Sequence, residues 1–599
     1  MTIQDATGTE QRWDLSDLYT GMNAPELAAD LKRLEDEART FNRDFAGKVG
    51  QLDGKALAAA IRRYEEIDEG LSRIMSFAYL LHAGDVADQA IGQFYQSMQE
   101  KVTTLSTPLI FFTLEINRME EADLQQKLKA PELARYSPWL RDVRIFRPHQ
   151  LSDEVERLLH EKQVAGQSAW MRLYDETLTS LRFPIDGKEL TEAEALNLLS
   201  NPDRAVRRKA AEAIGKVFTA NMRLFTRITN TLAKDKEIED TWRRYSTPAA
   251  SRHLANRLEG EVVEALVSSV RAAFPSLSHR YYAMKARWMG GGQLDYWDRN
   301  APLPDADERT IPWTGARDIV LSAYARFSPD MAAVGKRFFD NAWIDVGVRP
   351  GKWAGAFAHP TVPSVHPYLL VNYQGKIRDV MTLAHELGHG VHQVLAAKQG
   401  HLMADTPLTL AETASVFGEM LTFRSLLDGM KEPKRRKAFL ASKVEDMLNT
   451  VVRQIAFHGF ETRVHTERRE GELSTDRLCQ IWMDIQTESL GPALRFDEGY
   501  RVYWTYIHHF IHSPFYVYAY AFGDCLVNSL YSAYEEEAAA GRGEDFARRY
   551  MDMLAAGGTK RHKELLAPFG LDASDPGFWD RGLNVIRRYI DELEALDQA

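Results

Sequence analysis

Two histidines and a glutamate occur at a spacing that suits metal-assisted hydrolysis. Residues 385–389 read His-Glu-Leu-Gly-His. On a helix, residues four apart lie about 40° from one another around the axis and one turn apart along it, so His385 and His389 share a face. Two imidazoles placed in this way can bind one tetrahedral zinc ion at about 2.0–2.1 Å. Glu386 is adjacent to the first ligand, where its carboxylate can take the proton of an attacking water while the ion polarises a carbonyl.

The residues around this motif predict a helix over 378–397 that is buried along one side. Apolar side chains recur there at helical spacing: Val380, Leu383, Leu387, Val391 and Leu395. With 17 histidines in 599 residues, chance would supply only about 0.04 such motifs. The alternative, two core histidines satisfied by hydrogen bonds, is therefore the weaker interpretation. His392 lies about 10 Å along the axis from His385, so we expect it near the ligands and not among them.

Glu412 is the predicted third ligand, because a catalytic zinc ion has three protein ligands and one open position. Thr406-Pro407 predicts a helix start, which places Glu412 inside an apolar helix where a carboxylate needs a cation. The alternative is a capping box between Thr409 and Glu412. Glu419 is a fallback ligand, or a hydrogen-bond partner of a ligating histidine. Small residues flank Glu412 and would let two helices approach closely: Ala411, Ala414 and Ser415.

A segment rich in histidine and aromatic residues, 503–520, is the predicted source of a hydrogen-bond donor for the developing oxyanion. Ser513-Pro514 is typical of a cap followed by proline in the first turn, so we expect a helix from Phe515 to about residue 537. Aromatic core packing is the alternative for each tyrosine of this segment. Its early turns carry Tyr516, Tyr518 and Tyr520.

Helical patterns dominate the remaining sequence, which predicts a mainly α fold. The predicted helices cover residues 26–41, 54–71, 87–105, 151–163, 204–240 and 259–286. The turn-rich segment 183–188 predicts a short hairpin. We expect it to separate an N-terminal helical lobe, residues 1–185, from a catalytic region, residues 186–599.

One small β-sheet is expected just before the metal-binding helix. Residues 290–304 and 345–367 are rich in glycine and proline and predict irregular loops. Residues 368–373 read Tyr-Leu-Leu-Val-Asn-Tyr and predict a strand. We expect this strand to pair with the backbone of a bound peptide.

Charge and composition restrict the classes of partner. The formal net charge is −11 without a basic patch, which argues against nucleic acid. Cys479 and Cys525 are the two cysteines, too few for a disulfide framework and typical of a reducing compartment. Residues 1–6 are polar and do not resemble a signal peptide, and the apolar run 109–112 is too short to cross a membrane. The sequence predicts a soluble cytoplasmic protein, a monomer or a small homo-oligomer.

These motifs resemble the M3 family of zinc metallopeptidases, in the oligoendopeptidase F branch related to thimet oligopeptidase. The resemblance rests on residues 382–393, on 408–423 with Glu-Thr-Ala-Ser at 412–415, and on 509–518, with weaker support from 13–19 and 352–357. It implies a two-lobed helical shell around a deep substrate channel, with a small sheet whose edge strand lies beside the metal. It also implies cleavage of internal bonds in short peptides.

The family's pattern assigns roles to individual residues of this chain. His385, His389 and Glu412 would bind one Zn²⁺ ion, and Glu386 would be the general base. His509 and Tyr518, with Tyr516 next, would hold the substrate and the oxyanion.

The chain departs from that pattern within 503–520, so the assignment of roles there stays open. Alanine occupies position 519, where glutamine is common in the family. Three histidines are present in place of one: His508, His509 and His512.

The expected function is a zinc endopeptidase acting on short peptides, and two alternatives remain. One is a metallocarboxypeptidase with a similar helical shell. The other is a non-catalytic peptide-binding scaffold with a structural metal, against which Glu386 argues because a structural site needs no base. Manganese or cobalt could replace zinc at such a site.

Overall fold

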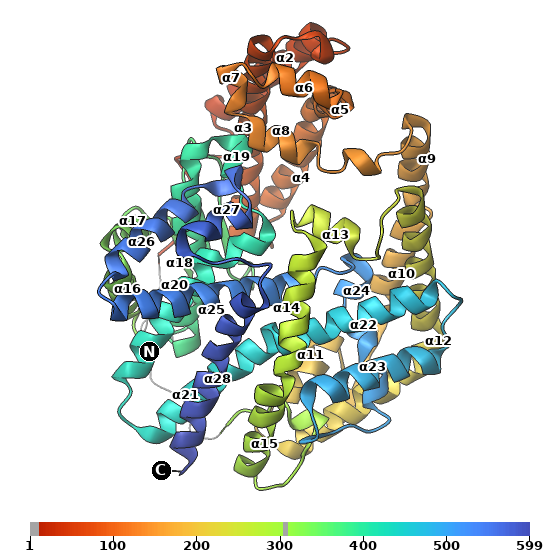
Figure 1. Ribbon diagram of the computed structural model, residues 1–599, viewed down its shortest axis with the longest axis vertical. Coiled ribbons are helices and arrows are strands. Elements are labelled where there is room, and N and C mark those ends of the chain that lie inside the picture. The colour runs from red at the N-terminus through yellow and green to blue at the C-terminus, as the bar shows by residue number, and fades with distance from the viewer. Residues whose placement is uncertain (1–10, 304–309, 599) are drawn as a thin grey trace. The chain divides into compact units, whose positions relative to one another are not determined.

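Two compact units, each built mainly from helices, make up the computed structural model, which describes residues 11–303 and 310–598 (Figure 1). Unit 1 combines the described parts of 1–148, 308–429 and 533–571, and unit 2 those of 149–307, 430–532 and 572–599. The mainly α prediction is confirmed. The expectation for residues 1–6 lies outside the described residues. Within these, none of the helices is long and apolar enough to cross a membrane.

Unit 1 contains an N-terminal group of helices and a second group around a small sheet. The first group is α2 (Pro25–Phe45), α3 (Gly54–Gly84), α4 (Gln89–Ser106), α5 (Ile110–Arg118), α6 (Glu121–Lys127), α7 (Pro131–Ala134) and α8 (Ser137–Val143). The second group is α16 (Trp313–Phe327), α17 (Pro329–Asp340), β4 (Ile344–Gly347), β5 (Phe357–His359), β6 (Tyr368–Tyr373), α18 (Ile377–Ala396), α19 (His401–Ala404), α20 (Leu408–Gly429), α26 (Gly543–Leu554) and α27 (His562–Leu566).

Unit 2 is organised around the long helix α12. Its first elements are α9 (Asp153–Gln163), α10 (Gln167–Ser180), β1 (Phe183–Ile185), β2 (Lys188–Leu190), α11 (Glu192–Asn197), α12 (Arg204–Trp242), α13 (Ala250–Ala255), α14 (Gly260–Ala273), α15 (Ser278–Trp288) and β3 (Leu294–Asp295). They are followed by α21 (Pro433–Thr450), α22 (Val452–Arg468), α23 (Thr475–Leu490), β7 (Leu494–Arg495), α24 (His509–His512), α25 (Tyr518–Ala539), of which residues 518–532 belong to this unit, and α28 (Pro576–Gln598).

The predicted strand 368–373 is β6, but it is the central strand of its sheet. The strand order is β4-β6-β5, with β4 parallel and β5 antiparallel to β6. Because both edges of β6 are paired, the expectation that this strand binds a peptide backbone is wrong. The edge strand β5 lies inside the segment predicted as an irregular loop.

Buried ion pairs fix the connection between β4 and β5. Asp345 on β4 is fully buried, and its carboxylate lies 2.7 Å from the Lys352 ammonium and 2.6 Å from the Arg349 guanidinium. The Lys352 ammonium also donates to the carbonyl of Val371 on β6 at 2.6 Å. These contacts satisfy charges that would be costly to bury alone, and they order a segment that is rich in glycine and proline.

Two further pairs of strands lie in unit 2. The predicted hairpin at 183–188 is confirmed as the antiparallel pair of β1 and β2. The sequence did not indicate the second pair, in which the two-residue strands β3 and β7 run parallel.

Tertiary structure changes two of the predicted helices. Residues 259–286 form α14 and α15, separated by a 3-10 turn at Phe274–Ser276, because Pro275 has no backbone N–H to continue the helix. The helix expected from Phe515 begins at Tyr518 as α25. Phe515 has a φ of 61°, and its N–H donates to the buried carboxylate of Glu461 at 2.8 Å.

Helices α18 and α20 pack closely against each other, because glycine occupies position 388 of α18. A Cβ at Gly388 would collide with the carbonyl oxygen of Ala414 and lie 2.6 Å from the Cα of Ser415. Both are backbone atoms of α20, which cannot move aside as a flexible side chain can. This contact confirms the close approach expected from the small residues of the second helix.

We expect Gly388→Ala to destabilise unit 1 by about 1–3 kcal/mol through overpacking and to weaken metal binding by moving α20. Gly92→Ala in α4 is the matched control, since a Cβ there meets nothing within 4 Å and should stabilise the helix by about 0.5–1 kcal/mol. Thermal unfolding of the two variants checks the prediction. An unchanged melting temperature in Gly388→Ala would contradict the packing described here.

Candidate metal centre

The three predicted metal ligands come together between α18 and α20. The Nε2 atoms of His385 and His389 lie 3.4 and 3.5 Å from Oε2 of Glu412. An ion bound tetrahedrally at about 2.0–2.1 Å separates its ligand atoms by about 3.3–3.4 Å, so this set of donors fits zinc. The side chains are 27%, 19% and 33% exposed, which leaves access for water or a substrate. Glu412 does not cap its helix, because α20 begins at Leu408.

Protein groups on the far side of each imidazole orient the two histidines. Glu419 on α20 lies 3.2 Å from Nδ1 of His385, and the carbonyl of Ala411 accepts from the His389 ring. A carboxylate or carbonyl at one ring nitrogen fixes the tautomer that presents the other nitrogen to a metal. Burial lowers the pKa of His389 to about 4, so this imidazole is neutral at pH 7 and free to ligate.

The Glu412 carboxylate is held by its own helix. The Ser415 hydroxyl donates to Oε2 of Glu412 at 2.6 Å. This is the same oxygen that faces both histidines. The bond therefore fixes the direction in which the carboxylate points.

Glu386 lies beside the three ligands but is turned toward the sheet. Its side chain is 8% exposed, and the backbone N–H of Ala358 on β5 donates to its carboxylate. Burial raises the pKa of Glu386 to about 7, with a further rise from Glu412 that is opposed by His385 and the Ala358 N–H. A base whose pKa lies near neutrality is suited to both accepting and returning a proton.

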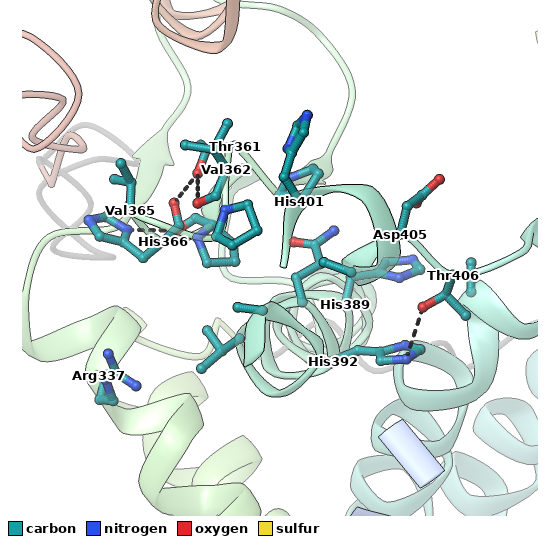
Figure 2. A pocket seen from close by; sticks show the side chains of 18 residues that line it. Arg337, Thr361, Val362, Val365, His366, His389, His392, His401, Asp405 and Thr406 are labelled. Carbon is teal, nitrogen blue, oxygen red and sulfur yellow. Dashed lines mark hydrogen bonds between the residues drawn. The ribbon is translucent and has the colours of Figure 1, made fainter. Parts of the chain in front are cut away.

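A pocket of about 450 Å³ borders His389 within unit 1 (Figure 2). Its wall includes the loop 360–367, Asp405 and Thr406. His392 also lines it but is largely buried, and its Nε2 lies 3.3 Å from the Thr406 hydroxyl. This contact agrees with the expectation that His392 lies near the ligands without joining them. The pocket is large enough to hold a side chain of a bound molecule.

We expect Glu419→Gln to lower zinc affinity by about 10–100-fold, because it removes the charge that supports His385. Competition with a chromogenic chelator measures this affinity. Glu132→Gln on α7 is the control, since Glu132 is exposed and lies outside the centre. Equal zinc affinity in both variants would show that Glu419 does not support the ligand.

The predicted donors His509 and Tyr516 lie together in unit 2. Their rings stack with centroids 5.8 Å apart. Nε2 of His509 lies 3.1 Å from the hydroxyl of Tyr520, an exposed residue outside the predicted set of donors. The four-residue spacing between Tyr516 and Tyr520 is the sequence signal from which their proximity could have been predicted.

Tyr518 points elsewhere within the same unit. Its side chain is fully buried. Its hydroxyl accepts from the Asn256 amide at 2.8 Å and lies 3.0 Å from Nδ1 of His253. Burial raises the pKa of Tyr518 well above its usual value. The geometry thus groups His509 with Tyr516 and Tyr520, and places Tyr518 in a separate hydrogen-bonded group.

Comparison with known sequences identifies two matching family profiles. The profile described as Peptidase family M3 matches residues 324–585, and the one described as Oligopeptidase F matches residues 115–183. Oligopeptidase PepF of Bacillus subtilis is 28% identical, over 95% of this chain and 87% of its own. Group B oligopeptidase PepB of Streptococcus agalactiae is 26% identical, over 98% of this chain and 97% of its own.

Solved structures share the fold over nearly the whole chain. A putative peptidase from Chlamydophila abortus superposes with a TM-score of 0.86 at 22% identity, covering 100% of this chain and 99% of that one. Oligoendopeptidase-F from Enterococcus faecium gives a TM-score of 0.69 at 22% identity, covering 96% and 98%. The two profile matches and the curated relatives show that the chain belongs to peptidase family M3, in its oligoendopeptidase F branch.

Proposed function

We propose that this metallopeptidase is a zinc-dependent endopeptidase that hydrolyses internal bonds of short peptides. The observation that carries the proposal is that Nε2 of His385 and Nε2 of His389 lie 3.4 and 3.5 Å from one carboxylate oxygen of Glu412, with Glu386 beside them. The curated relatives are named oligopeptidases, and their names support peptides of limited length as substrates.

The residues of the centre divide the chemistry between them. An ion held by the three ligands supplies Lewis-acid chemistry, polarising the scissile carbonyl and lowering the pKa of water. Glu386 takes the proton of the attacking water and returns it to the leaving amine. Burial and the Ala358 N–H keep its carboxylate in one position during both transfers. Manganese or cobalt would suit the same donor set.

The edge strand β5 is the proposed binding strand for the peptide backbone. It forms one edge of the sheet, and its residue Ala358 contacts the general base. An extended peptide that adds to this edge would lie beside the ligands. N-methylation at successive substrate positions should slow cleavage at those that bond to β5. Indifference at every position would remove this part of the proposal.

Oxyanion stabilisation remains a proposal for His509, Tyr516 and Tyr518. Losing one such donor costs about 10²–10³-fold in kcat, so kinetics of His509→Gln, Tyr516→Phe and Tyr518→Phe separate the candidates. A variant with reduced stability and unchanged kcat identifies a packing residue. The contacts of Tyr518 favour that outcome for Tyr518→Phe.

Other expectations from the sequence also remain proposals. Cys479 and Cys525 are both free and buried, which supports a reducing compartment and thus a cytoplasmic location. We retain a monomer or a small homo-oligomer as the expected assembly. The division into an N-terminal lobe, residues 1–185, and a catalytic region, residues 186–599, also stays a prediction. The two compact units of the structure have different boundaries.

Cleavage mapping in a mixed peptide library, with mass spectrometry and metal analysis, tests the proposed function. We expect internal cuts, and we expect substrates with an amidated C-terminus to be cut as fast as free acids. A metallocarboxypeptidase would not cleave substrates with an amidated C-terminus, and a peptide-binding scaffold would show no peptide turnover. Either result would overturn the proposal.

A further inference from the structure

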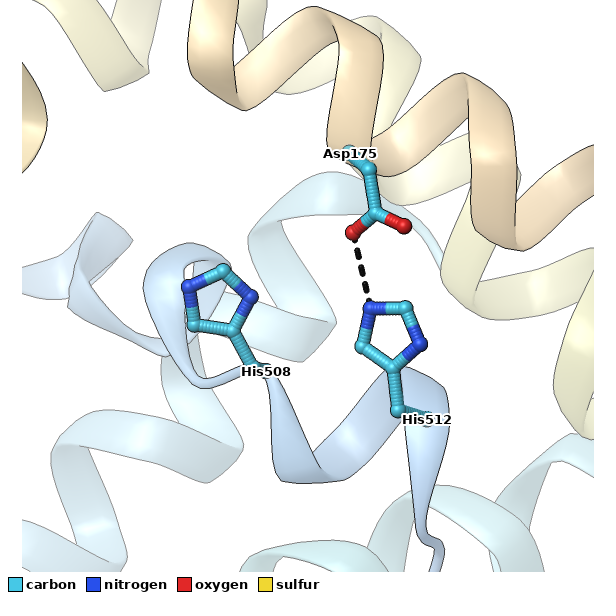
Figure 3. Close-up of side chains that lie close together, drawn as sticks. All are labelled: Asp175, His508 and His512. Carbon is cyan, nitrogen blue, oxygen red and sulfur yellow. Dashed lines mark hydrogen bonds and ion pairs between the residues drawn. The ribbon is translucent and has the colours of Figure 1, made fainter. Parts of the chain in front are cut away.

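A second cluster of potential metal ligands lies in unit 2 and shares none of the residues of the centre in unit 1. Asp175 projects from α10, while His508 and His512 lie one turn apart at α24, and both imidazoles point toward the carboxylate (Figure 3). One ligand atom from each residue lies within 4.8 Å of the others. Nε2 of His512 is 2.8 Å from Oδ1 of Asp175.

A buried tyrosine next to Asp175 supports both imidazoles. The ring of Tyr174 is 1% exposed and meets His508 and His512 edge to face, with centroids 5.7 and 6.0 Å away. The Tyr174 hydroxyl donates to the carbonyl of Thr505 at 2.9 Å. Adjacent residues of α10 therefore provide the carboxylate and the surface against which the two rings pack.

The donor set suits a divalent transition metal. Imidazole nitrogens and one carboxylate are ligands of zinc, and ligand atoms around a tetrahedral ion lie about 3.3–3.4 Å apart. The His512 and Asp175 side chains are 32% and 47% exposed, so an ion can enter and keep water on its open side.

The protonation of His508 is compatible with ligation. Partial burial lowers the pKa of His508, His512 lowers it further, and Asp175 opposes them. A lowered pKa favours the neutral imidazole, the form that binds a metal.

We propose that Asp175, His508 and His512 form a second binding site for a divalent transition-metal ion, zinc in particular. An ion at this site joins α24 to α10. Because His509 is on the same short helix, the ion would also restrict the helix that carries a proposed catalytic residue. The binding site itself does not depend on the catalytic proposal.

Metal titration of the full chain in a His389→Ala background tests the proposal, because that substitution weakens the first centre. Cobalt is the probe, followed by its visible d–d absorption and by calorimetry. We expect about one equivalent of Co²⁺ per chain to bind in this background, and competition by zinc. Adding His512→Ala should abolish that equivalent, while adding His160→Ala, an exposed histidine of α9, should leave it intact.

Equal cobalt binding with and without His512→Ala would overturn the proposal. Asp175→Asn in the same background is the second variant, and circular dichroism verifies that each protein is folded. If Asp175→Asn and His512→Ala both bind as the parent does, the three residues form only a hydrogen-bonded cluster. Peptide turnover by the wild-type enzyme is measured separately. A negative result for cobalt binding at the second site would therefore leave the catalytic assignment unaffected.

Discussion

Glu386→Gln is expected to lower kcat by about 10²–10⁴-fold while zinc stays bound. The amide is similar in size to the carboxylate but cannot accept the proton of the attacking water. Since Glu386 is buried and is not one of the three grouped candidate ligands, its replacement should leave those ligands in place. The unfolding temperature should not fall, because the substitution removes a carboxylate from a largely desolvated position.

Steady-state kinetics with a quenched fluorescent peptide, together with zinc analysis of the same samples, checks this prediction. Glu419→Gln is the informative comparison, because it should weaken zinc binding and recover turnover when zinc is added. Glu386→Gln should not recover at any zinc concentration. Wild-type turnover in Glu386→Gln would exclude this residue as the base.

Glu412→Gln is expected to reduce zinc affinity by more than the roughly 100-fold that loss of a supporting residue costs. Its carboxylate faces both histidines from the opposite helix, so its charge is lost from the centre itself. Glutamine keeps an acceptor for the Ser415 hydroxyl, which should preserve the local packing. After dialysis against a weak chelator, the variant should contain little zinc and show little activity.

The matched comparison for Glu412→Gln is again Glu419→Gln, which alters the other carboxylate of the same helix. The ligand assignment predicts the larger loss of zinc in Glu412→Gln. The reverse order would make Glu419 the ligand and Glu412 its support. That outcome would contradict the geometry, in which Glu419 lies at Nδ1 of His385.

The grouping of the three candidate ligands could be predicted because its geometry is mostly local. The spacing of His385 and His389 fixes their common face, and the small residues around Glu412 indicate the close contact that brings it to them. The proline at 407 located the start of the second helix to within one residue. These features depend on helix periodicity and chain stiffness, which are local properties and can be inferred from a single sequence.

The edge strand β5, proposed to bind the peptide, could not be predicted in the same way. Strand β5 has three residues within a glycine-rich segment, and it is ordered by pairing with β6 and by the buried Lys352. Its position at the edge is a property of the whole sheet. The longer and more apolar β6 gave the clear local signal, yet it occupies the centre.

The segment 503–520 shows a different limit of local signals. Ser513-Pro514 is typical of a helix start, but the chain turns there because Phe515 adopts a positive φ and its N–H bonds to Glu461. As a result α25 begins at Tyr518, and Tyr518 enters the interior while Tyr520 faces His509. A tertiary contact with α22 therefore decides which tyrosine is accessible.

Anomalous diffraction at the zinc edge, from crystals of the zinc-loaded protein, tests the central claim most directly. We predict a peak about 2.0–2.2 Å from Nε2 of His385, Nε2 of His389 and Oε2 of Glu412, with the fourth position open to solvent. A peak at Asp175 would bear only on the second site. The absence of zinc between α18 and α20 would contradict the account, and so would a fourth protein ligand that occupies the open coordination position of the ion.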